Sequence, residues 1–276
     1  MNIENYLAKI KLPDPQSHKG QNGKLLVIGG SELFHASIFW SADVASRIVD
    51  MVHFSSPANE NNQLVREKIK TNFWQGIVVD FTDIDTYIQE DDCVLIGPGM
   101  ERSDATQKLV NQLLTKHPHK KWVVDGGALQ MVDPKLLGTT TIITPHHREL
   151  QYLAANFEHL PVEQTNQDQV DRVLAELLNQ GVTILQKGPI DYVLFGQEKI
   201  EIAGGNAGMT KGGTGDVLAG LVAALYCKND GATSAAVGSY INKKAGEYLW
   251  EKVGPYFNAS DLLAVIPEQL FRLLAK

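Results

Sequence analysis

Cysteine is scarce in this sequence, and the two cysteines are far apart along the chain. Only Cys93 and Cys227 occur among 276 residues, each inside an apolar run without a second cysteine nearby. A zinc site or a redox pair needs closely spaced thiols, or thiols beside histidines, so the sequence gives no pattern for either kind of site. We therefore expect two buried free thiols, the usual state of isolated cysteines in protein cores.

Long hydrophobic runs are also missing. The longest apolar run, Val217–Cys227, is well short of the roughly 20 residues that a membrane-spanning helix needs. The N-terminal stretch, Met1–Lys11, lacks the basic region and following apolar core of a signal peptide. The sequence therefore predicts a cytoplasmic protein with no membrane span.

Positive charge is in deficit, because 25 Lys and Arg residues stand against 32 Asp and Glu, a formal net charge of −7. Such a chain has no general affinity for nucleic acid or anionic membrane, so the expected partner is a small molecule. Hydrophobic residues make up 43% of the chain, which suffices for a sizeable core. Since no repeat, low-complexity segment or linker interrupts the sequence, we expect one domain over residues 1–276.

Short β-rich apolar runs alternate with segments of helical length. Leu25–Ile28 precedes Ala36–Val49, and Val94–Ile96 precedes Ala105–Leu114. This alternation predicts an α/β fold with a mostly parallel central sheet and helices on both faces. The other predicted strands are Met51–Ser55, Ile77–Val79, Trp122–Val124, Thr141–Ile143 and an antiparallel edge of Val182–Leu185, Tyr192–Phe195 and Ile200–Ala203. The other predicted helices are Val170–Leu178 and three that should cover one side of the sheet, Val217–Tyr226, Ala232–Trp250 and Asp261–Leu274.

The densest chemical signal is the glycine-rich segment Asn206–Asp216, which runs directly into the predicted helix Val217–Tyr226. Backbone N–H groups at a helix start, with the helix dipole behind them, bind anions. Gly212, Gly213 and Gly215 allow that backbone to approach a phosphate closely. We therefore predict a phosphate-handling loop at Gly212–Asp216.

Asp216, which closes this loop, has two interpretations. It is a helix N-cap, a common position for Asp, or it accepts a proton from a substrate hydroxyl. A carboxylate repels phosphate, so an Asp beside an anion-binding loop is best explained by a role in the reaction. We favour the base.

The residues from Gly212 to Gly220 resemble the C-terminal signature of the ADP/ATP-dependent NAD(P)H-hydrate dehydratases, a family of the ribokinase-like superfamily. The resemblance covers most of the chain, and Gly212–Gly220 together with the Thr-Pro-His-x-x-Glu-Leu segment starting at Thr144 makes it specific. It implies a single ribokinase-like domain. The other similar segments, in the family's order, are Gly29-Gly30-Ser31, Gly97-Pro98-Gly99, Asp125–Leu129 and Lys187-Gly188-Pro189.

This resemblance implies an enzyme that repairs hydrated NADH or NADPH. It would phosphorylate the ring hydroxyl of the S-epimer with ADP or ATP, together with Mg²⁺, and then expel phosphate, which makes it formally a hydro-lyase. By motif position Asp216 would be the base, and the amides of Gly213, Thr214 and Gly215 would stabilise the transferred phosphoryl group. The family also suggests a homo-oligomer, and an epimerase, for which this chain has no room, would be a separate polypeptide.

The remaining roles are carried over by the same resemblance. The hydrated dinucleotide would contact Ser37, Gly99, His146 and Asp216, and Glu149 would serve the Mg²⁺ ion. Each has a plainer interpretation: His146 closes a turn, Glu149 is an ordinary first-turn acid, Lys187 is a surface lysine, and Gly97–Gly99 is only a tight turn. The residues implied for the nucleotide are Lys187, Gly188, Pro189, Ile190, Asp191, Asn206, Gly212 and Gly215.

Two positions depart from the family pattern. The family more often has Gly-Ala where this chain has Ala36-Ser37, so Ser37 either narrows the dinucleotide pocket or contributes a hydrogen bond. A second acid is usual where this chain has Gly127, which puts any supporting role of that acid in doubt. His147, usually a small residue or Pro in the family, is expected to face solvent.

Two other functions fit the same residues. A ribokinase-like kinase for a thiamine precursor, hydroxymethylpyrimidine or hydroxyethylthiazole, also carries a Gly-x-Gly-Asp loop. A nucleotide-binding subunit without catalysis is suggested by the altered Phe34–Ser37 segment, although the intact Gly212–Asp216 loop favours an enzyme. The sequence decides neither between ADP and ATP nor between NADH and NADPH.

Overall fold

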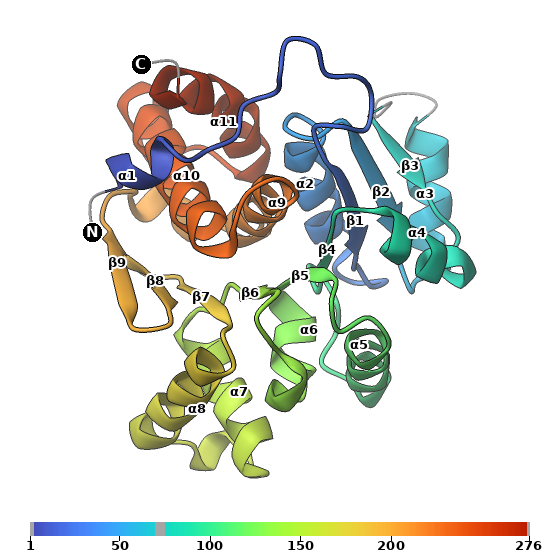
Figure 1. The fold of residues 1–276 in the computed structure, drawn as a ribbon, viewed down its shortest axis with the longest axis vertical. Helices are drawn as coiled ribbons and strands as arrows, with labels where there is room; N and C mark the ends of the chain where they lie inside the picture. The colour runs from blue at the N-terminus through green and yellow to red at the C-terminus, as the bar shows by residue number, and fades with distance from the viewer. Residues whose placement is uncertain (1–2, 70–74, 275–276) are drawn as a thin grey trace.

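A computed structural model describes residues 3–69 and 75–274, and within them the strands form one sheet in the order β3-β2-β1-β4-β5-β6-β7-β8-β9 (Figure 1). Strands β3 to β7 of this order are parallel, whereas β8 and β9 continue the sheet antiparallel. The predicted sheet and its antiparallel edge are confirmed, with strand ends within two residues of those predicted. The strands are β1 (Lys24–Ile28), β2 (Met51–Ser55), β3 (Gly76–Val78), β4 (Cys93–Ile96), β5 (Lys121–Val124), β6 (Thr141–Ile143), β7 (Thr183–Gln186), β8 (Asp191–Phe195) and β9 (Glu198–Ile202).

Helices cover both faces of the sheet, as predicted. In β1, Leu25 and Val27 pack into the core on one face, while Leu26 and Ile28 pack into the core on the other. Side chains alternate along a strand, so a strand covered on both faces is apolar throughout. The first face carries α2 (His35–Ala45), α9 (Thr214–Tyr226) and α10 (Gly231–Val253), and the second carries α4 (Ile84–Glu90), α5 (Asp104–Lys116), α6 (Gly126–Met131), α7 (His147–Glu158) and α8 (Gln167–Asn179).

The C-terminal helices form two layers rather than one. Figure 1 shows α9, α10 and α11 (Ala259–Leu274) together on one side of the sheet. Helices α9 and α10 lie on the strands, whereas α11 packs mainly on α10, α2 and α9. The expectation that all three helices cover the sheet directly is therefore correct for the first two, and α11 covers them in turn. The remaining helices are α1 (Glu4–Leu7) and α3 (Asn59–Ile69).

The helix predicted over Ala36–Val49 ends early, at Ala45. Residues 46–50 turn back toward β2, and Asp50 and Met51 donate backbone hydrogen bonds to the carbonyl of Gly23. A methyl group on Gly23 would lie 2.8 Å from a Val49 methyl. The helix therefore ends where the chain packs against Gly23, just before β1. Local sequence patterns do not predict this contact, because it joins segments that are distant in the sequence.

The fold brings the two cysteines together. Cys93 and Cys227 are both buried and free, as predicted, and they lie near each other, while the Cys227 thiol donates to the backbone carbonyls of Lys24 at 3.4 Å and Ala223 at 3.5 Å. Burial raises the pKa of the Cys227 thiol, which keeps it protonated. Across residues 3–69 and 75–274, no helix is both long and apolar enough to cross a membrane.

Candidate functional site

Several candidate residues meet at the carboxyl ends of the parallel strands, where open α/β sheets bind ligands. Gly97–Gly99 follows β4, and the Pro98 carbonyl accepts a 2.7 Å hydrogen bond from the amide of Gly30, which follows β1. Asp125 follows β5 and accepts a 2.6 Å hydrogen bond from the hydroxyl of Thr144, which follows β6. The topology thus brings four separate sequence segments together at one edge of the sheet.

Lys187 is held among carboxylates at this edge. Its ammonium donates to Asp125 Oδ1 at 2.9 Å and lies 3.6 Å from Glu149 Oε2. Burial lowers the pKa of Lys187, but the charges of Asp125 and Glu149 outweigh burial, so the pKa is raised overall. Lys187 is therefore a permanent positive charge at the floor of the site and not a surface lysine.

Asp216 does not cap α9. The N-cap is Gly213, no side chain accepts a capping hydrogen bond there, and Asp216 lies half-buried in the first turn. Burial, followed by the charge of Asp125, raises the pKa of Asp216 to about 7, although a hydrogen bond from Ser37 and the charge of Lys187 act against the rise. A carboxyl group with a pKa near neutrality has the proton affinity that a general base needs. The cap interpretation is wrong, and the base interpretation stays a prediction that the raised pKa of Asp216 supports.

The loop before α9 is shaped to approach an anion. Gly213 has a φ of 94°, and a side chain there would meet the Trp40 ring at 2.4 Å. A β-carbon on Gly215 would lie 3.6 Å from Lys187 Nζ, so the start of α9 faces the lysine ammonium. First-turn amides of a helix have no partner within the helix. The amides and the ammonium together form a site for a phosphate group.

A pocket of about 640 Å³ adjoins this phosphate site. It is bounded by residues 187–191, by residues 204–210, by the start of α9 and by α10. Ile190, which is 41% exposed, and Gly212 lie outside its lining. The predicted residues that line it are His146, Lys187, Gly188, Pro189, Asp191, Asn206, Thr214 and Gly215. Ala207, Met209, Thr210 and Leu218 also line it, and they lie within the predicted Asn206–Asp216 and Gly212–Gly220 segments. The lining residues that the sequence did not indicate are Gly204, Gly205, Asn242 and Lys243.

Lys243 of α10 fastens two loops of this pocket. Its buried ammonium donates to the carbonyls of Gly188 (3.2 Å), Pro189 (3.1 Å) and Gly204 (3.2 Å) and lies 3.4 Å from Asp191 Oδ1. Asp191 in turn accepts hydrogen bonds from the Gly188 amide and the Ser239 hydroxyl. Asp191, which was predicted to contact the nucleotide, is thus occupied in holding the loop.

Replacing Lys243 with methionine is expected to destabilise the protein by about 3–5 kcal/mol, because Asp191 is left as an unpaired buried charge. The freed loops should also raise KM for the nucleotide more than they lower kcat. Thermal unfolding and steady-state kinetics measure the two effects. The double variant Lys243→Met with Asp191→Asn removes the stranded charge and should recover part of the stability; no recovery would contradict the pairing.

Ser37 and Gly99 are neighbours beside Asp216. A β-carbon on Gly99 would lie 2.3 Å from the Phe34 carbonyl oxygen and 3.0 Å from Ser37 Cβ. Of the two interpretations of Ser37, the structure favours the hydrogen bond, because the Ser37 hydroxyl lies near enough to the Asp216 carboxylate to lower its pKa. Gly97–Gly99 is thus more than a turn, because it places Gly99 against Ser37.

His146 lines the pocket together with Lys187, whereas Ser37 and Gly99 are not part of its lining. Its Nδ1 accepts the Glu149 amide at 3.1 Å, and Glu149 Oε2 accepts the His146 amide at 2.8 Å, which forms a capping box at the start of α7. His146 therefore does close a turn, with its ring half exposed at the pocket. His147 is exposed, as expected.

Glu149 is buried, and burial raises the pKa of its carboxyl group. Its oxygens already serve the His146 amide, Lys187 and, at 3.4 Å, the Gln130 amide. Within the described parts of the chain, no three His, Cys, Asp or Glu side chains are grouped to hold a metal ion. The assignment of Glu149 to Mg²⁺ stays a prediction.

The structure shows the roles of two residues in the Asp125–Leu129 segment, Gly127 and Asp125. A side chain on Gly127 would meet the Met100 carbonyl oxygen at 2.0 Å, so a second acid has no room there. Asp125, which was not among the predicted site residues, is the buried partner of Lys187 and Thr144. A polar residue directly after a buried strand was the signal that would have found it.

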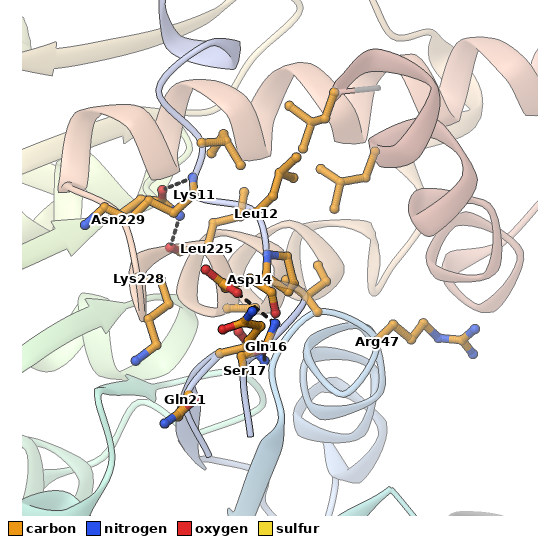
Figure 2. A pocket seen from close by; sticks show the side chains of 17 residues that line it. Lys11, Leu12, Asp14, Gln16, Ser17, Gln21, Arg47, Leu225, Lys228 and Asn229 are labelled. Carbon is orange, nitrogen blue, oxygen red and sulfur yellow. Dashed lines mark hydrogen bonds between the residues drawn. The ribbon is translucent and has the colours of Figure 1, made fainter. Parts of the chain in front are cut away.

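A second pocket, of about 580 Å³, lies away from this site, between the N-terminal segment and the helices α9 and α11 (Figure 2). Its lining includes Lys11, Asp14, Lys228 and Asn229 but no predicted site residue. Figure 2 shows that some of its polar groups bond within the protein, as in the 2.9 Å bond from the Lys11 amide to Asn229 Oδ1. The chemistry is therefore assigned to the carboxyl edge of the sheet.

Comparison with solved structures bears out the ribokinase-like fold. A ribokinase-like superfamily protein from Enterococcus faecalis superposes with a TM-score of 0.81 at 22% identity, covering 100% of this chain and 96% of that one. The ADP/ATP-dependent NAD(P)H-hydrate dehydratase from Bacillus subtilis, co-crystallised with ATP and Mg²⁺, superposes with a TM-score of 0.76 at 20% identity, covering 99% and 97%. At these identities the likeness establishes the fold.

Sequence comparison identifies the family. A bifunctional NAD(P)H-hydrate repair enzyme from Methanocaldococcus jannaschii is 32% identical over 96% of this chain and 51% of its own length, so the chain spans about half of that relative. An ADP-dependent (S)-NAD(P)H-hydrate dehydratase from Nitrosopumilus maritimus is 31% identical, covering 91% of this chain and 89% of the relative. The family model for NAD(P)H-hydrate dehydratase matches residues 25–268. Because this match spans most of the sequence, the chain belongs to the NAD(P)H-hydrate dehydratase family.

Proposed function

We propose that this chain dehydrates the S-epimer of hydrated NADH and NADPH, with ADP or ATP as the phosphoryl donor. The observation that carries the proposal is Asp216, a carboxyl group of pKa about 7 between the phosphate-binding loop and the Ser37–Gly99 surface. The curated relative that spans most of this chain carries the same activity in its name, which supports the proposal.

The arrangement divides the reaction between two sides of Asp216. The nucleotide occupies the 640 Å³ pocket, with its terminal phosphate at the amides of α9 and the Lys187 ammonium. Asp216 takes the proton of the ring hydroxyl as its oxygen attacks phosphorus, and the amides of Gly213, Thr214 and Gly215 hold the charge on the phosphoryl oxygens. The bond between the transferred phosphoryl group and the donor breaks in the same step, so AMP leaves from ADP or ADP leaves from ATP. The phosphorylated ring then expels phosphate and loses a proton from the neighbouring ring carbon, which forms the double bond of the dihydronicotinamide.

Mg²⁺ fits this site only as a companion of the nucleotide. Because the described residues offer no three-ligand cluster, the ion would be held by phosphate oxygens and water, with Glu149 as the acid toward it. It would neutralise phosphate charge, and the steps above rest on the chain's own groups. We further propose a cytoplasmic homo-oligomer that works with a separate epimerase, a partnership suggested by the bifunctional relatives.

The test is recovery of NADH absorbance when hydrated NADH is mixed with the protein and ADP or ATP. Reactions without nucleotide and reactions with the R-epimer alone serve as controls and should stay inactive. A parallel reaction with hydroxymethylpyrimidine or hydroxyethylthiazole tests the kinase alternative. No NADH recovery, together with phosphate transfer to either alcohol, would replace the proposal.

Replacing Ser37 with alanine is expected to shift the acid limb of the kcat/KM profile to higher pH. The Ser37 hydrogen bond lowers the pKa of Asp216, so its loss leaves less carboxylate at a given acidic pH, by about tenfold for one pKa unit. Activity on the alkaline plateau should change little.

Ser41→Ala is the matched control, because the Ser41 hydroxyl donates to the backbone carbonyl of Asp216 at 2.8 Å and not to its carboxylate. Its pH profile should match that of the wild type. An unshifted pH profile in Ser37→Ala would show that the Ser37 hydroxyl does not lower the pKa of Asp216.

A further inference from the structure

Two arginines, Arg102 and Arg148, enclose the ring of Tyr152 in α7. The Arg102 guanidinium carbon lies 5.1 Å from the centre of the Tyr152 ring, and that of Arg148 lies 5.5 Å from the same centre. Arg102 also donates a hydrogen bond to the Tyr152 hydroxyl. Stacking on a ring holds a guanidinium in a defined orientation. Tyr152 is half-buried and therefore orients two exposed arginines, one from the loop before α5 and one from α7.

These two cations have no carboxylate partner among the described residues, and this distinguishes them from the rest of the arginines. Arg148 donates to the neutral Gln151 side chain at 3.1 Å, and Arg102 bonds only the Tyr152 hydroxyl. Two adjacent positive charges without an acid are unusual in a chain with a net charge of −7. The other arginines each lie within 3.4 Å of a carboxylate oxygen: Arg47 at Asp43, Arg66 at Asp80, Arg172 at Glu158 and Arg272 at Glu268.

Arg102 and Arg148 each lie a few residues along the chain from a residue of the candidate site. Arg102 follows the Gly97–Gly99 loop, whose last residue would touch Ser37 through a β-carbon at 3.0 Å. Arg148 follows His146, which pairs with Lys187 in a β-bridge. The two guanidinium groups therefore extend from the segments that carry the two halves of the site.

From this arrangement we infer that Arg102 and Arg148, aligned on Tyr152, bind a phosphate group of the dinucleotide substrate. The guanidinium fork matches phosphate oxygens, and two of them suit a dianion better than a neutral group. Hydrated NADH and NADPH share a diphosphate, and NADPH adds a 2′-phosphate, so either group has the required chemistry. The inference rests on the proposed function, since it names how that substrate is held.

The experiment compares wild type with the double variant Arg102→Ala and Arg148→Ala, using hydrated NADH and hydrated NADPH separately. Loss of charge-assisted bonds to a phosphate should raise KM for the substrate by about tenfold or more, with kcat and KM for ADP nearly unchanged. A rise for both substrates assigns the diphosphate, and a rise for hydrated NADPH alone assigns the 2′-phosphate. Arg172→Ala, which removes an exposed arginine that pairs with Glu158, is the matched control and should leave both KM values unchanged.

The inference is overturned if the folded double variant keeps both KM values, or if it loses kcat alone. Failure of the proposed function is a separate result, seen when the wild type itself does not regenerate NADH. In that case, calorimetric titration of the wild type and the double variant with NADH and with NADPH still tests whether Arg102 and Arg148 bind a phosphate group of the dinucleotide. Equal affinity of the two proteins for each dinucleotide would reject it.

Discussion

Replacing Asp216 with asparagine will lower kcat by several powers of ten, with little change in KM for ADP. Asparagine has nearly the same size and still offers an oxygen to the Ser37 hydroxyl, but it does not accept the proton of the substrate hydroxyl. The phosphate site is built from backbone amides and Lys187, so nucleotide binding should survive. Steady-state kinetics with hydrated NADH measures the loss.

The stability of this variant distinguishes a base from a structural residue. The pKa of Asp216 in the folded protein, about 7, lies above that of an unfolded Asp, so the folded state favours the protonated form. The stabilisation from this group is complete at pH below about 4 and is lost as pH rises through about 7. Asparagine carries no charge at any pH, so the variant should be at least as stable as wild type at about pH 8.

Asp168→Asn, which changes an exposed acid in the first turn of α8, is the matched control and should leave activity intact. A folded Asp216→Asn protein with wild-type kcat would instead show that Asp216 is not the base. A wild-type protein that binds the nucleotide but turns over no hydrated NADH would support the nucleotide-binding subunit without catalysis.

The sequence predicted the sheet well because each strand of a parallel sheet buried on both faces is a short apolar run, and these runs alternate with helical segments along the chain. The strands predicted at Met51–Ser55 and Thr141–Ile143 have the observed bounds. What it did not predict depends on contacts between distant segments. The end of α2 at Ala45 is set by packing near Gly23, and α11 rests on other helices.

The same division applies to the site. The phosphate-binding loop and Lys187 lie in local motifs and were predicted. Asp125 was missed, because its partner Lys187 is 62 residues away, and so was Lys243, whose carbonyl partners belong to other loops. The capping box of His146 and Glu149 is local, but His is not among the preferred cap residues, so the pattern favoured a ligand role.

Replacing Lys187 with methionine will reduce both stability and activity. Asp125 and Glu149 are buried, and without the ammonium they face each other and Asp216 as uncompensated negative charges. Breaking a buried ion pair by removing one partner costs about 3–5 kcal/mol. Since Lys187 lowers the pKa of Asp216, its loss should also shift the acid limb of the activity profile to higher pH.

The pH dependence of this destabilisation tests its cause. Burial raises the pKa values of Glu149 and Asp216 above those of the unfolded chain, so their protonated forms are compatible with the fold at low pH, and stability falls as pH rises through the raised values. The melting temperature of Lys187→Met should therefore lie near that of wild type at about pH 5 and well below it at about pH 8. Lys187→Arg keeps the charge and should retain most of the stability. Lys116→Met removes a half-exposed lysine that pairs with Asp85 and should cost about 1 kcal/mol or less. A deficit for Lys187→Met that is the same at both pH values would mean that lost packing, and not the stranded charge, is what destabilises the site.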